Sequence, residues 1–245
     1  MSQDRLIENA FEDIAQSLRI LLEADARANH QGLLFTDRAE AVGNIETALS
    51  SVLNAFHSMY DAIGKQLGNN SIDWYQTGPL ATILAIRNAR HHNQANRIRT
   101  LYTYHAQEAE RLDQMAQYVY VDFPSPEKGA DTFDVYMSWA DLRHLLSLPE
   151  SESRIRPDTG TVIRHYLSSE KFSGYASNYE LSESRVFFNI VPLFVNAAAK
   201  IVPAIKSHLR GTSTESKFFV DHFSTVENAD TKNHEVNCGP FVLPK

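Results

Sequence analysis

The spacing of apolar residues over the first 67 positions is the feature that most restricts the possible folds. From about residue 3 to 28 they recur every three or four positions, at Ile7, Ala10, Phe11, Ile14, Leu18, Leu21 and Leu22. A second series follows at Val42, Ile45, Leu49, Val52, Phe56, Met59 and Ile63. Such spacing places each series on one face of an α-helix. The sequence therefore predicts two long amphipathic helices, separated by the short polar break NHQG.

Residue types at the helix ends predict where helices begin and stop. Asp37, with Glu40 three residues later, predicts a capped start for the second helix, which ends at GNN. Pro79 in TGPL predicts the first turn of a third helix, because a missing N–H costs nothing there. Helical spacing then continues or restarts between Asn93 and Tyr118. Three or four helices with short connections predict a mainly α fold with an antiparallel helical bundle over residues 1–118.

For residues 119–245 the sequence predicts a mostly helical extension that packs on this bundle. The stretch VYVDF after Tyr118 alternates briefly in polarity and is followed by prolines, which predicts a short strand. Ser138 followed by Asp141 predicts the capped start of a short helix. Another helix is expected at 162–167.

The apolar stretch at 184–210 predicts a long buried helix that stops at Gly211. Prolines, asparagines and Lys200 interrupt this stretch, which argues against a membrane span. Its apolar face should therefore pack on the bundle. From Thr212 onward no period is sustained, which predicts an irregular C-terminal tail.

Charge and cysteine content narrow the classes of function. A formal net charge of −7 argues against a protein that coats nucleic acid with its whole surface. Residues 74–107 nevertheless contain no Asp or Glu, which predicts a local positive patch. A single cysteine, Cys238, excludes a disulfide framework and a cysteine-based zinc site. Because the first residues are acidic where an export signal needs basic ones, we expect a cytoplasmic location.

Positive charge is concentrated in LAIRNARHHNQANRIRTL, residues 84–101, which holds four arginines and two adjacent histidines. On a helical wheel, Arg87, His91 and Gln94 share the side of the apolar residues that should face the bundle. Burying unpaired charge there would be costly, so this face is expected to open onto a cleft, a partner or an anion.

The alternative is that the helix breaks at residues 91–93 with Asn93 as its cap, which leaves the histidines exposed at its end.

Within this segment Arg87, Asn88 and His92 form the pattern Arg-Asn-x-x-x-His. This pattern resembles the signature of the HEPN superfamily, helical-bundle proteins found among RNA-cleaving toxins, phage-defence systems and RNA-guided RNases. The resemblance covers residues 1–118 and rests on one short motif and on helix order. It implies a HEPN-like bundle, an RNA substrate and a homodimer that pairs two motifs in one composite site. The resemblance also allows an antitoxin protein as a binding partner.

The residue types of the motif suit metal-independent cleavage of single-stranded RNA. RNA carries its own nucleophile, the 2′-hydroxyl, so cleavage needs a base, an acid and a cation on the phosphorane. We therefore predict Arg87, Asn88 and His92 as catalytic residues, with Arg as the phosphate contact, Asn as a positioning group and His as acid or base. His91, Arg90 and Gln94 are alternative or supporting residues, and the choice between His91 and His92 stays open.

Other chemistries find less support in the sequence. The adjacent histidines lack a His-Glu-x-x-His pattern, and the neighbouring arginines would repel a cation, so neither a metal nor a cofactor is predicted. No nucleophile elbow, phosphate-binding loop or dinucleotide fingerprint is present. Two rival hypotheses remain. One is a catalytically inactive HEPN-like module that binds nucleotide, RNA or protein, and the other is an unrelated helical protein with a coincidental motif.

Overall fold

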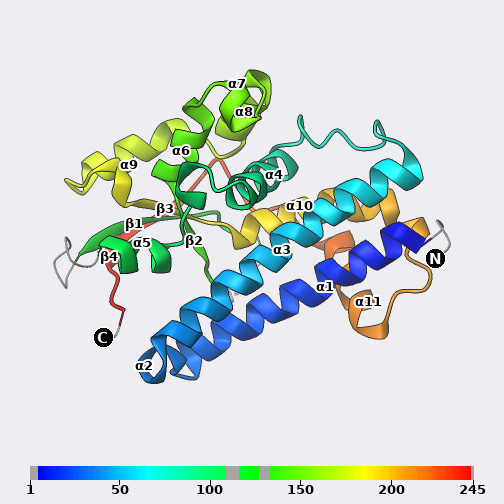
Figure 1. Ribbon diagram of the computed structural model, residues 1–245, viewed down its shortest axis with the longest axis horizontal. Coiled ribbons are helices and arrows are strands. Elements are labelled where there is room, and N and C mark those ends of the chain that lie inside the picture. The colour runs from blue at the N-terminus through cyan, green and yellow to red at the C-terminus, as the bar shows by residue number, and fades with distance from the viewer. Residues whose placement is uncertain (1–4, 109–115, 127–132, 244–245) are drawn as a thin grey trace.

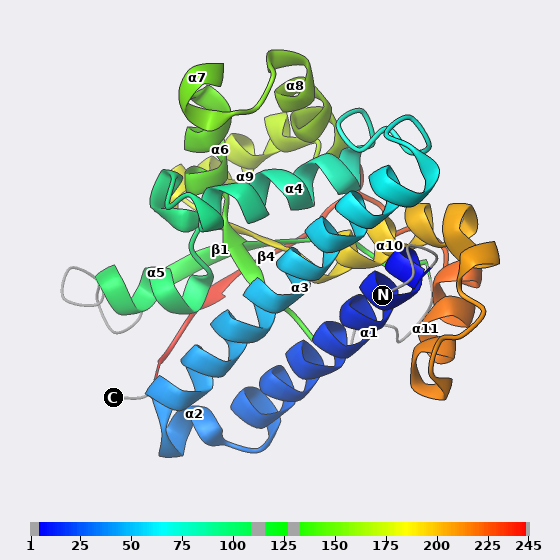
Figure 2. The same ribbon diagram turned by 45° about the vertical axis from the view of Figure 1, so that its right-hand side comes forward.

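The computed structural model describes residues 5–108, 116–126 and 133–243, and the fold is mainly α. The chain begins with two long helices, α1 (Leu6–Asp25) and α3 (Arg38–Leu67), joined by a π-helical turn and the one-turn helix α2 (Leu33–Thr36). They lie antiparallel and side by side in both ribbon views (Figures 1 and 2). The two amphipathic helices predicted from the sequence are therefore confirmed.

Local signals place the start of α3 where the sequence predicts it. The Asp37 carboxylate accepts a hydrogen bond from the backbone N–H of Glu40 at 2.9 Å, which satisfies one of the unpaired amides of the first turn. The predicted apolar residues of α3 are buried from Ile45 to Ile63. In α1 the predicted stripe is buried as far as Leu21 apart from the partly buried Leu18, whereas Leu22 stays 47% exposed.

The third predicted helix is α4 (Gly78–His91), with Pro79 in its first turn. It does not continue: Asn93 adopts a left-handed conformation with φ 56°, and the N–H of Gln94 bonds to the carbonyl of Ala89 at 2.8 Å. This is the left-handed cap that commonly closes a helix. The alternative with a break at residues 91–93 is thus the correct one.

After α4 the chain forms a 3₁₀ turn and then the short helix α5 (Leu101–Glu108). The part of the predicted helix at 109–115 lies outside the described residues. The predicted short strand is confirmed as β1 (Gln117–Asp122). Along the rest of the chain the helices are α6 (Trp139–Ser147), α7 (Glu150–Ser153), α8 (Pro157–Tyr166), α9 (Phe172–Asn178), α10 (Val191–Ile205) and α11 (Thr214–Thr225).

Four short strands form one mixed sheet in the order β2-β3-β1-β4. The remaining strands are β2 (Tyr136–Ser138), β3 (Val186–Asn189) and β4 (Glu235–Pro240). Strand β1 pairs parallel with β3 and antiparallel with β4, and β2 pairs antiparallel with β3. The sheet therefore joins four segments that are far apart in the sequence (Figure 1).

The predicted long helix at 184–210 is wrong in its first part. Residues Val186–Asn189 form β3, all four of them buried, and the helix α10 starts only at Val191. A short apolar run cannot be assigned to a strand or to a buried helix from its spacing alone. Here the pairing with β1, with Val119 opposite Val186 and Val121 opposite Phe188, decides in favour of a strand.

The predicted irregular tail from Thr212 is also wrong. Ser213 caps α11 by accepting from the N–H of Ser216 at 3.1 Å, and β4 adds an edge strand to the sheet. The tail has no apolar period because α11 buries only part of one face and β4 buries no residue completely. Its order depends on partners elsewhere in the chain.

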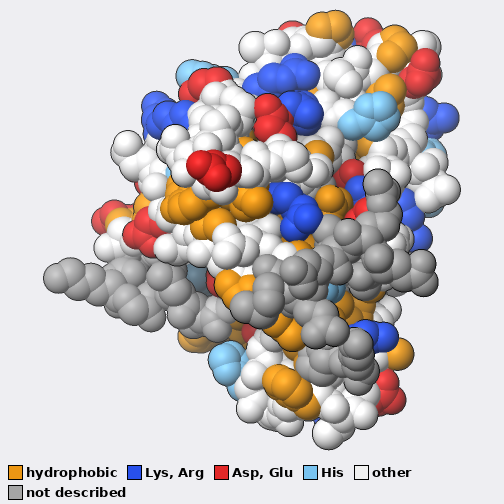
Figure 3. Space-filling view, turned by 90° about the vertical axis from the view of Figure 1, so that its left-hand side faces the viewer, with side chains coloured by type: hydrophobic (Ala, Val, Ile, Leu, Met, Phe, Trp, Pro, Cys, Tyr) orange, Lys and Arg blue, Asp and Glu red, His pale blue; other side chains and the backbone are white. Residues whose placement is uncertain are grey.

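One contiguous cluster of buried side chains runs through the molecule, from Ile7 in α1 to Leu243 near the C-terminus. Helix α10 packs on the first helices, with the rings of Phe56 and Phe194 stacked at 5.7 Å. No helix within the described ranges combines the length and the apolar character needed to cross a membrane. On the face formed by α5, α9 and β4, acidic and basic side chains are interspersed (Figure 3).

Candidate functional site

A polar cavity of about 250 Å³ lies between the middle of α3 and the end of α4, and we call it the Arg87 cleft. Three of the four arginines in the basic segment and one of its histidines line it. Its lining residues are Ser50, Leu53, Asn54, Arg87, Arg90, His91 and Arg97. The cleft therefore carries positive charge beside the last turns of α4.

Arg87 is held by two amides. Its Nε donates to Oδ1 of Asn54 at 3.2 Å, and its Nη1 donates to Oδ1 of Asn88 at 3.2 Å. Among the described residues it has no ion pair with a carboxylate. Burial lowers the pKa of the guanidinium while Asp61 opposes the shift, and an arginine stays charged throughout. The group is thus oriented but not neutralised, as a phosphate contact would need to be.

His91 and His92 follow at the end of α4, where the helix dipole favours positive charge. Their rings lie 4.9 Å apart at 77°, and both residues are exposed. Arg154, in the turn after α7, places its Nη1 3.2 Å from Nε2 of His92. Because a guanidinium only donates, that nitrogen of His92 is the acceptor.

The pKa of His92 lies below its usual value because of desolvation and the positive charges of Arg154, His91 and Arg87. The lowered pKa favours the neutral imidazole, which is the form that a general base requires.

A third histidine, His57 on α3, belongs to this group although the motif does not include it. It lies one helical turn after Asn54, and its Nδ1 is 3.7 Å from the Asp61 carboxylate. Burial, Arg87 and His91 lower its pKa, while Asp61 acts in the opposite direction. The charges of Arg87 and His91 thus act on His57, although His57 does not line the Arg87 cleft. The only signal in the sequence was the pair Asn54 and His57, which share one polar edge of a helix.

Arg90 and Gln94 hold the loop after α4 in place. Arg90 is 8% exposed and forms an ion pair with Glu46, and its Nη1 donates to the carbonyl of Ile98 at 3.3 Å. Gln94 lies beyond the end of the helix, so its position on the helical wheel does not apply, and its amide donates to the carbonyl of Glu152. Both side chains position backbone, and Arg90 also forms part of the cleft wall.

The backbone next to the cleft is unusual. Four consecutive residues, Ala95 to Ile98, have left-handed φ angles of 44°, 52°, 62° and 49°. Non-glycine residues pay about 1 to 3 kcal/mol each in such regions, and strain of this kind concentrates at binding sites. A wider groove of about 480 Å³ follows along α3 and shares Ser50, Asn54, Arg90 and Arg97 with the cleft. The two cavities therefore adjoin each other along α3.

Asn88 faces a different cavity from Arg87. It lines a space of about 530 Å³ between the ends of α3 and α4 and the segment 150–159. Arg154 lines the same space and also reaches His92. The predicted catalytic residues Arg87, Asn88 and His92 therefore lie close together, but they stand at the junction of two cavities.

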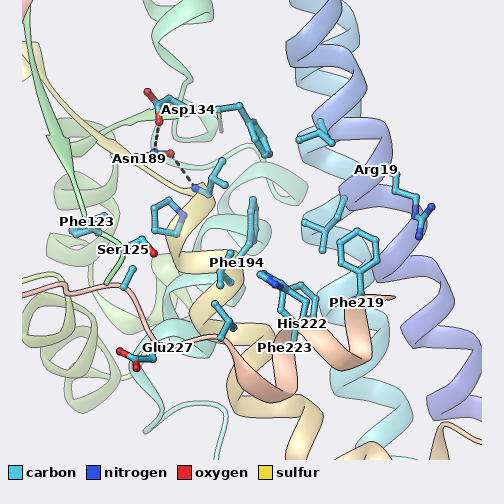
Figure 4. A pocket seen from close by; sticks show the side chains of 18 of the residues that line it. Arg19, Phe123, Ser125, Asp134, Asn189, Phe194, Phe219, His222, Phe223 and Glu227 are labelled. Atoms are coloured by element: carbon cyan, nitrogen blue, oxygen red, sulfur yellow. Dashed lines mark hydrogen bonds between the residues drawn. The ribbon is translucent and has the colours of Figure 1, made fainter. Parts of the chain in front are cut away.

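An apolar cavity of about 410 Å³ lies between α1, α10 and α11. The rings of Phe194, Phe219 and Phe223 gather around His222 there (Figure 4). It shares no lining residue with the Arg87 cleft. Within the described part of the chain, no group of three or more His, Cys, Asp or Glu side chains is arranged as a set of metal ligands.

Comparisons with protein-family models, with curated proteins and with solved structures found no match to this chain.

Proposed function

We propose that this protein is a HEPN-like, metal-independent endoribonuclease that cuts single-stranded RNA by attack of the 2′-hydroxyl. The observation that carries the proposal is a cleft that Arg87 shares with His91, where the guanidinium forms no ion pair with a carboxylate of the described residues. The charge of Arg87 also helps to lower the pKa values of His57 and His92. Arginine offers a bidentate contact to phosphate. A neutral imidazole can take the proton of the 2′-hydroxyl, and an imidazolium can protonate the leaving 5′-oxygen.

The roles follow from the surroundings of each side chain. Arg87 neutralises charge on the phosphorane, and Asn88 holds the guanidinium through its Oδ1. His92, with its lowered pKa, is the base. His91 or His57 supplies the acid. Cytoplasmic action as a toxin or defence effector, with an antitoxin as partner, is part of the proposal and rests on the motif.

A homodimer remains part of the proposal. Two copies related by a two-fold axis would bring both motifs to one cleft and double the number of acids and bases. His57 already gives each chain a further imidazole that the charge of Arg87 reaches. Light scattering at micromolar concentration should give twice the chain mass, and a monomer that retains full cleavage activity would remove the dimer from the mechanism.

One observation favours the alternative of an inactive module that binds nucleotide, RNA or protein. Nε2 of His92 already accepts a hydrogen bond from Arg154, so it must lose that contact before it can accept a substrate proton. In that alternative, Arg154 and His92 form a fixed wall of a binding site. Cleavage assays separate the two functions.

The experiment is cleavage of single-stranded RNA of mixed sequence in EDTA, with detection of 2′,3′-cyclic phosphate ends. We expect Arg87→Ala and His92→Ala each to slow cleavage by about 10²-fold or more. Asn88→Ala should give a smaller loss if its role is to position Arg87. His91→Ala and His57→Ala identify the acid, and a larger defect for His91→Ala than for His92→Ala would reverse the assignment of the base.

Arg27→Ala is the matched control. Arg27 is an exposed arginine that pairs with Glu23 near the C-terminal end of α1, and it does not line the Arg87 cleft. It should cut at the normal rate. Unchanged cleavage in the Arg87 and His92 variants would show that the activity does not come from this site. Failure to cut varied RNAs, together with tight nucleotide or protein binding lost in Arg87→Ala, would favour the inactive module.

A further inference from the structure

The cavity on the Asn88 side of the site has the walls of a nucleobase pocket. At about 530 Å³ it falls within the usual range for small-molecule sites. Tyr60 and Tyr75 form one side, with their rings 6.1 Å apart at 76°. Tyr60 is braced from behind by the buried ring of Trp74 at 5.4 Å, while Tyr75 is 42% exposed. The cavity thus has one rigid and one accessible aromatic wall.

A buried polar atom on the opposite side lacks a partner. Thr159, in the first turn of α8, is 4% exposed, and its Oγ1 makes no hydrogen bond to any described residue. Leaving a buried hydroxyl unpaired is unfavourable. Because Thr159 lines the cavity, a ligand that reaches its hydroxyl would satisfy it. Thr159 therefore points to a ligand with a hydrogen-bonding edge rather than to a purely apolar one.

The remaining polar groups of the cavity include both acidic and basic side chains. Glu150 is an exposed carboxylate on α7, and Arg154 and Arg156 follow it in the turn before α8. Oδ1 of Asn88 is occupied by Arg87, so its NH₂ is the group available to donate. The cavity thus combines one carboxylate that only accepts with two arginines that only donate, beside hydroxyls that can do both.

Guanine is the base whose hydrogen-bond donors and acceptors match these groups. Its N1–H and N2 amino group donate to a carboxylate, while O6 and N7 accept from an arginine or an amide. Adenine places an acceptor, N1, where guanine has a donor, so it would face Glu150 unfavourably. Base stacking on an aromatic ring alone would not discriminate between bases.

We propose that this cavity, formed by Tyr60, Tyr75, Asn88, Glu150, Arg156 and Thr159, is a guanine-binding subsite. It rests on the proposed function in that the guanine belongs to the RNA substrate. Arg154 links the two sites, because it lines the cavity and bonds to His92. A base seated here places its attached phosphate next to His92 and Arg87, so cleavage should prefer RNA with a guanosine beside the cut.

The direct test is calorimetric titration of the full-length protein with GMP and AMP, which requires no cleavage. We expect GMP to bind about tenfold or more tightly than AMP. Tyr75→Ala should weaken GMP binding by about tenfold, the usual loss for one stacking ring. Thr159→Val, which keeps the shape of the side chain, should weaken GMP binding without affecting the fold. Glu150→Ala should remove the preference for GMP over AMP.

Two controls match these variants. Tyr179→Ala removes a tyrosine that is 41% exposed, close to the exposure of Tyr75, and should bind GMP normally. Glu152→Ala removes a carboxylate from the same short helix as Glu150, and it should keep the preference for GMP.

Several outcomes overturn the inference. These are no heat of binding with millimolar GMP, equal affinity for AMP, or GMP binding unchanged in both Tyr75→Ala and Thr159→Val. If the protein binds GMP as expected but cuts no RNA, the subsite stands and the ribonuclease proposal fails. If it cuts RNA through Arg87 and His92 with no dependence on guanosine, the ribonuclease proposal stands and the subsite fails.

Discussion

Residues 87–99 contain four arginines, which form two pairs with opposite surroundings. Arg90 and Arg99 are paired with carboxylates from other elements, Glu46 and Asp141. Arg87 is held by amides, and Arg97 is exposed at the rim of the cleft. Arg90 and Arg99 therefore stabilise the fold. Arg87 and Arg97 keep their charge available to a ligand.

The partner of each arginine therefore matters more than its place in the sequence. Asp141 accepts from Nε of Arg99 at 2.8 Å, from its Nη2 at 2.9 Å and from its backbone N–H at 3.1 Å. Burial disfavours the charge of Arg99, but the bonds to Asp141 outweigh it and raise the pKa of the guanidinium. Such a pair fixes the backbone of the loop. Arg87 lacks a carboxylate of this kind and keeps its positive potential.

The largest expected effect tests this difference through stability. Asp141 is 3% exposed, and Asp141→Ala leaves the half-buried Arg99 only its longer ion pair with Glu108 at 3.7 Å. Removing one member of a buried ion pair typically costs about 3 to 5 kcal/mol. Arg87→Ala should change the free energy of unfolding by less than about 0.5 kcal/mol. Urea unfolding of both variants measures this, and equal losses would show that Arg87 is as structural as Arg99.

A smaller effect concerns Glu46 and its pH dependence. Burial alone would raise the pKa of Glu46, but Arg90 and the hydroxyls of Thr100 and Thr103 outweigh it, so the pKa is lowered. A lowered carboxylate pKa contributes stability above the unfolded value of about 4.3, and this contribution disappears as pH falls through the folded pKa. Glu46→Gln should therefore lose about 2 kcal/mol at pH 7. The difference from wild type should shrink below pH 4, and a constant difference would argue against the pairing.

The exposed arginine should act on RNA binding alone. With a 2′-O-methyl RNA, which cannot be cut by 2′-hydroxyl attack, Arg97→Ala should weaken binding a few-fold. It should also reduce the slope of log K against log salt by about 0.7, the value for one lost phosphate contact on a single strand. Arg143→Ala, at an exposed ion pair with Glu183, is the control and should leave the slope unchanged. Fluorescence anisotropy at several salt concentrations gives both values.

The smallest effect concerns the histidines of the cleft. The pKa values of His57 and His92 are both lowered, so these rings gain charge only as pH falls below about 6.5. Binding of the same RNA should therefore tighten about two- to fivefold between pH 7.5 and 5.5. The double variant His57→Gln/His92→Gln should flatten this dependence. An equal rise in the double variant would assign it to other groups.

The spacing of the motif along one helix was enough to bring Arg87, Asn88 and His92 close together. It did not show that Arg87 and Asn88 line separate cavities, since that depends on α3 and the segment 150–159. His57 and Arg154 lie 30 or more residues from the motif, so no local pattern links them to it. The assignment of the site to RNA cleavage stays a prediction.

The sequence alone determined the helices α1, α3 and α4 and the starts of α3 and α4, because helical hydrogen bonds, end signals and apolar stripes all involve residues a few positions apart. Tertiary structure decided the strands β3 and β4, whose hydrogen bonds go to β1, far away in the sequence. It also decided which arginines of the basic segment are neutralised. Residues 74–107 contain no acid, yet Glu46 and Asp141 reach into the segment from outside it. Electrostatic pairing depends on distance in space, so local composition could predict the charge of this segment but not where that charge remains unpaired.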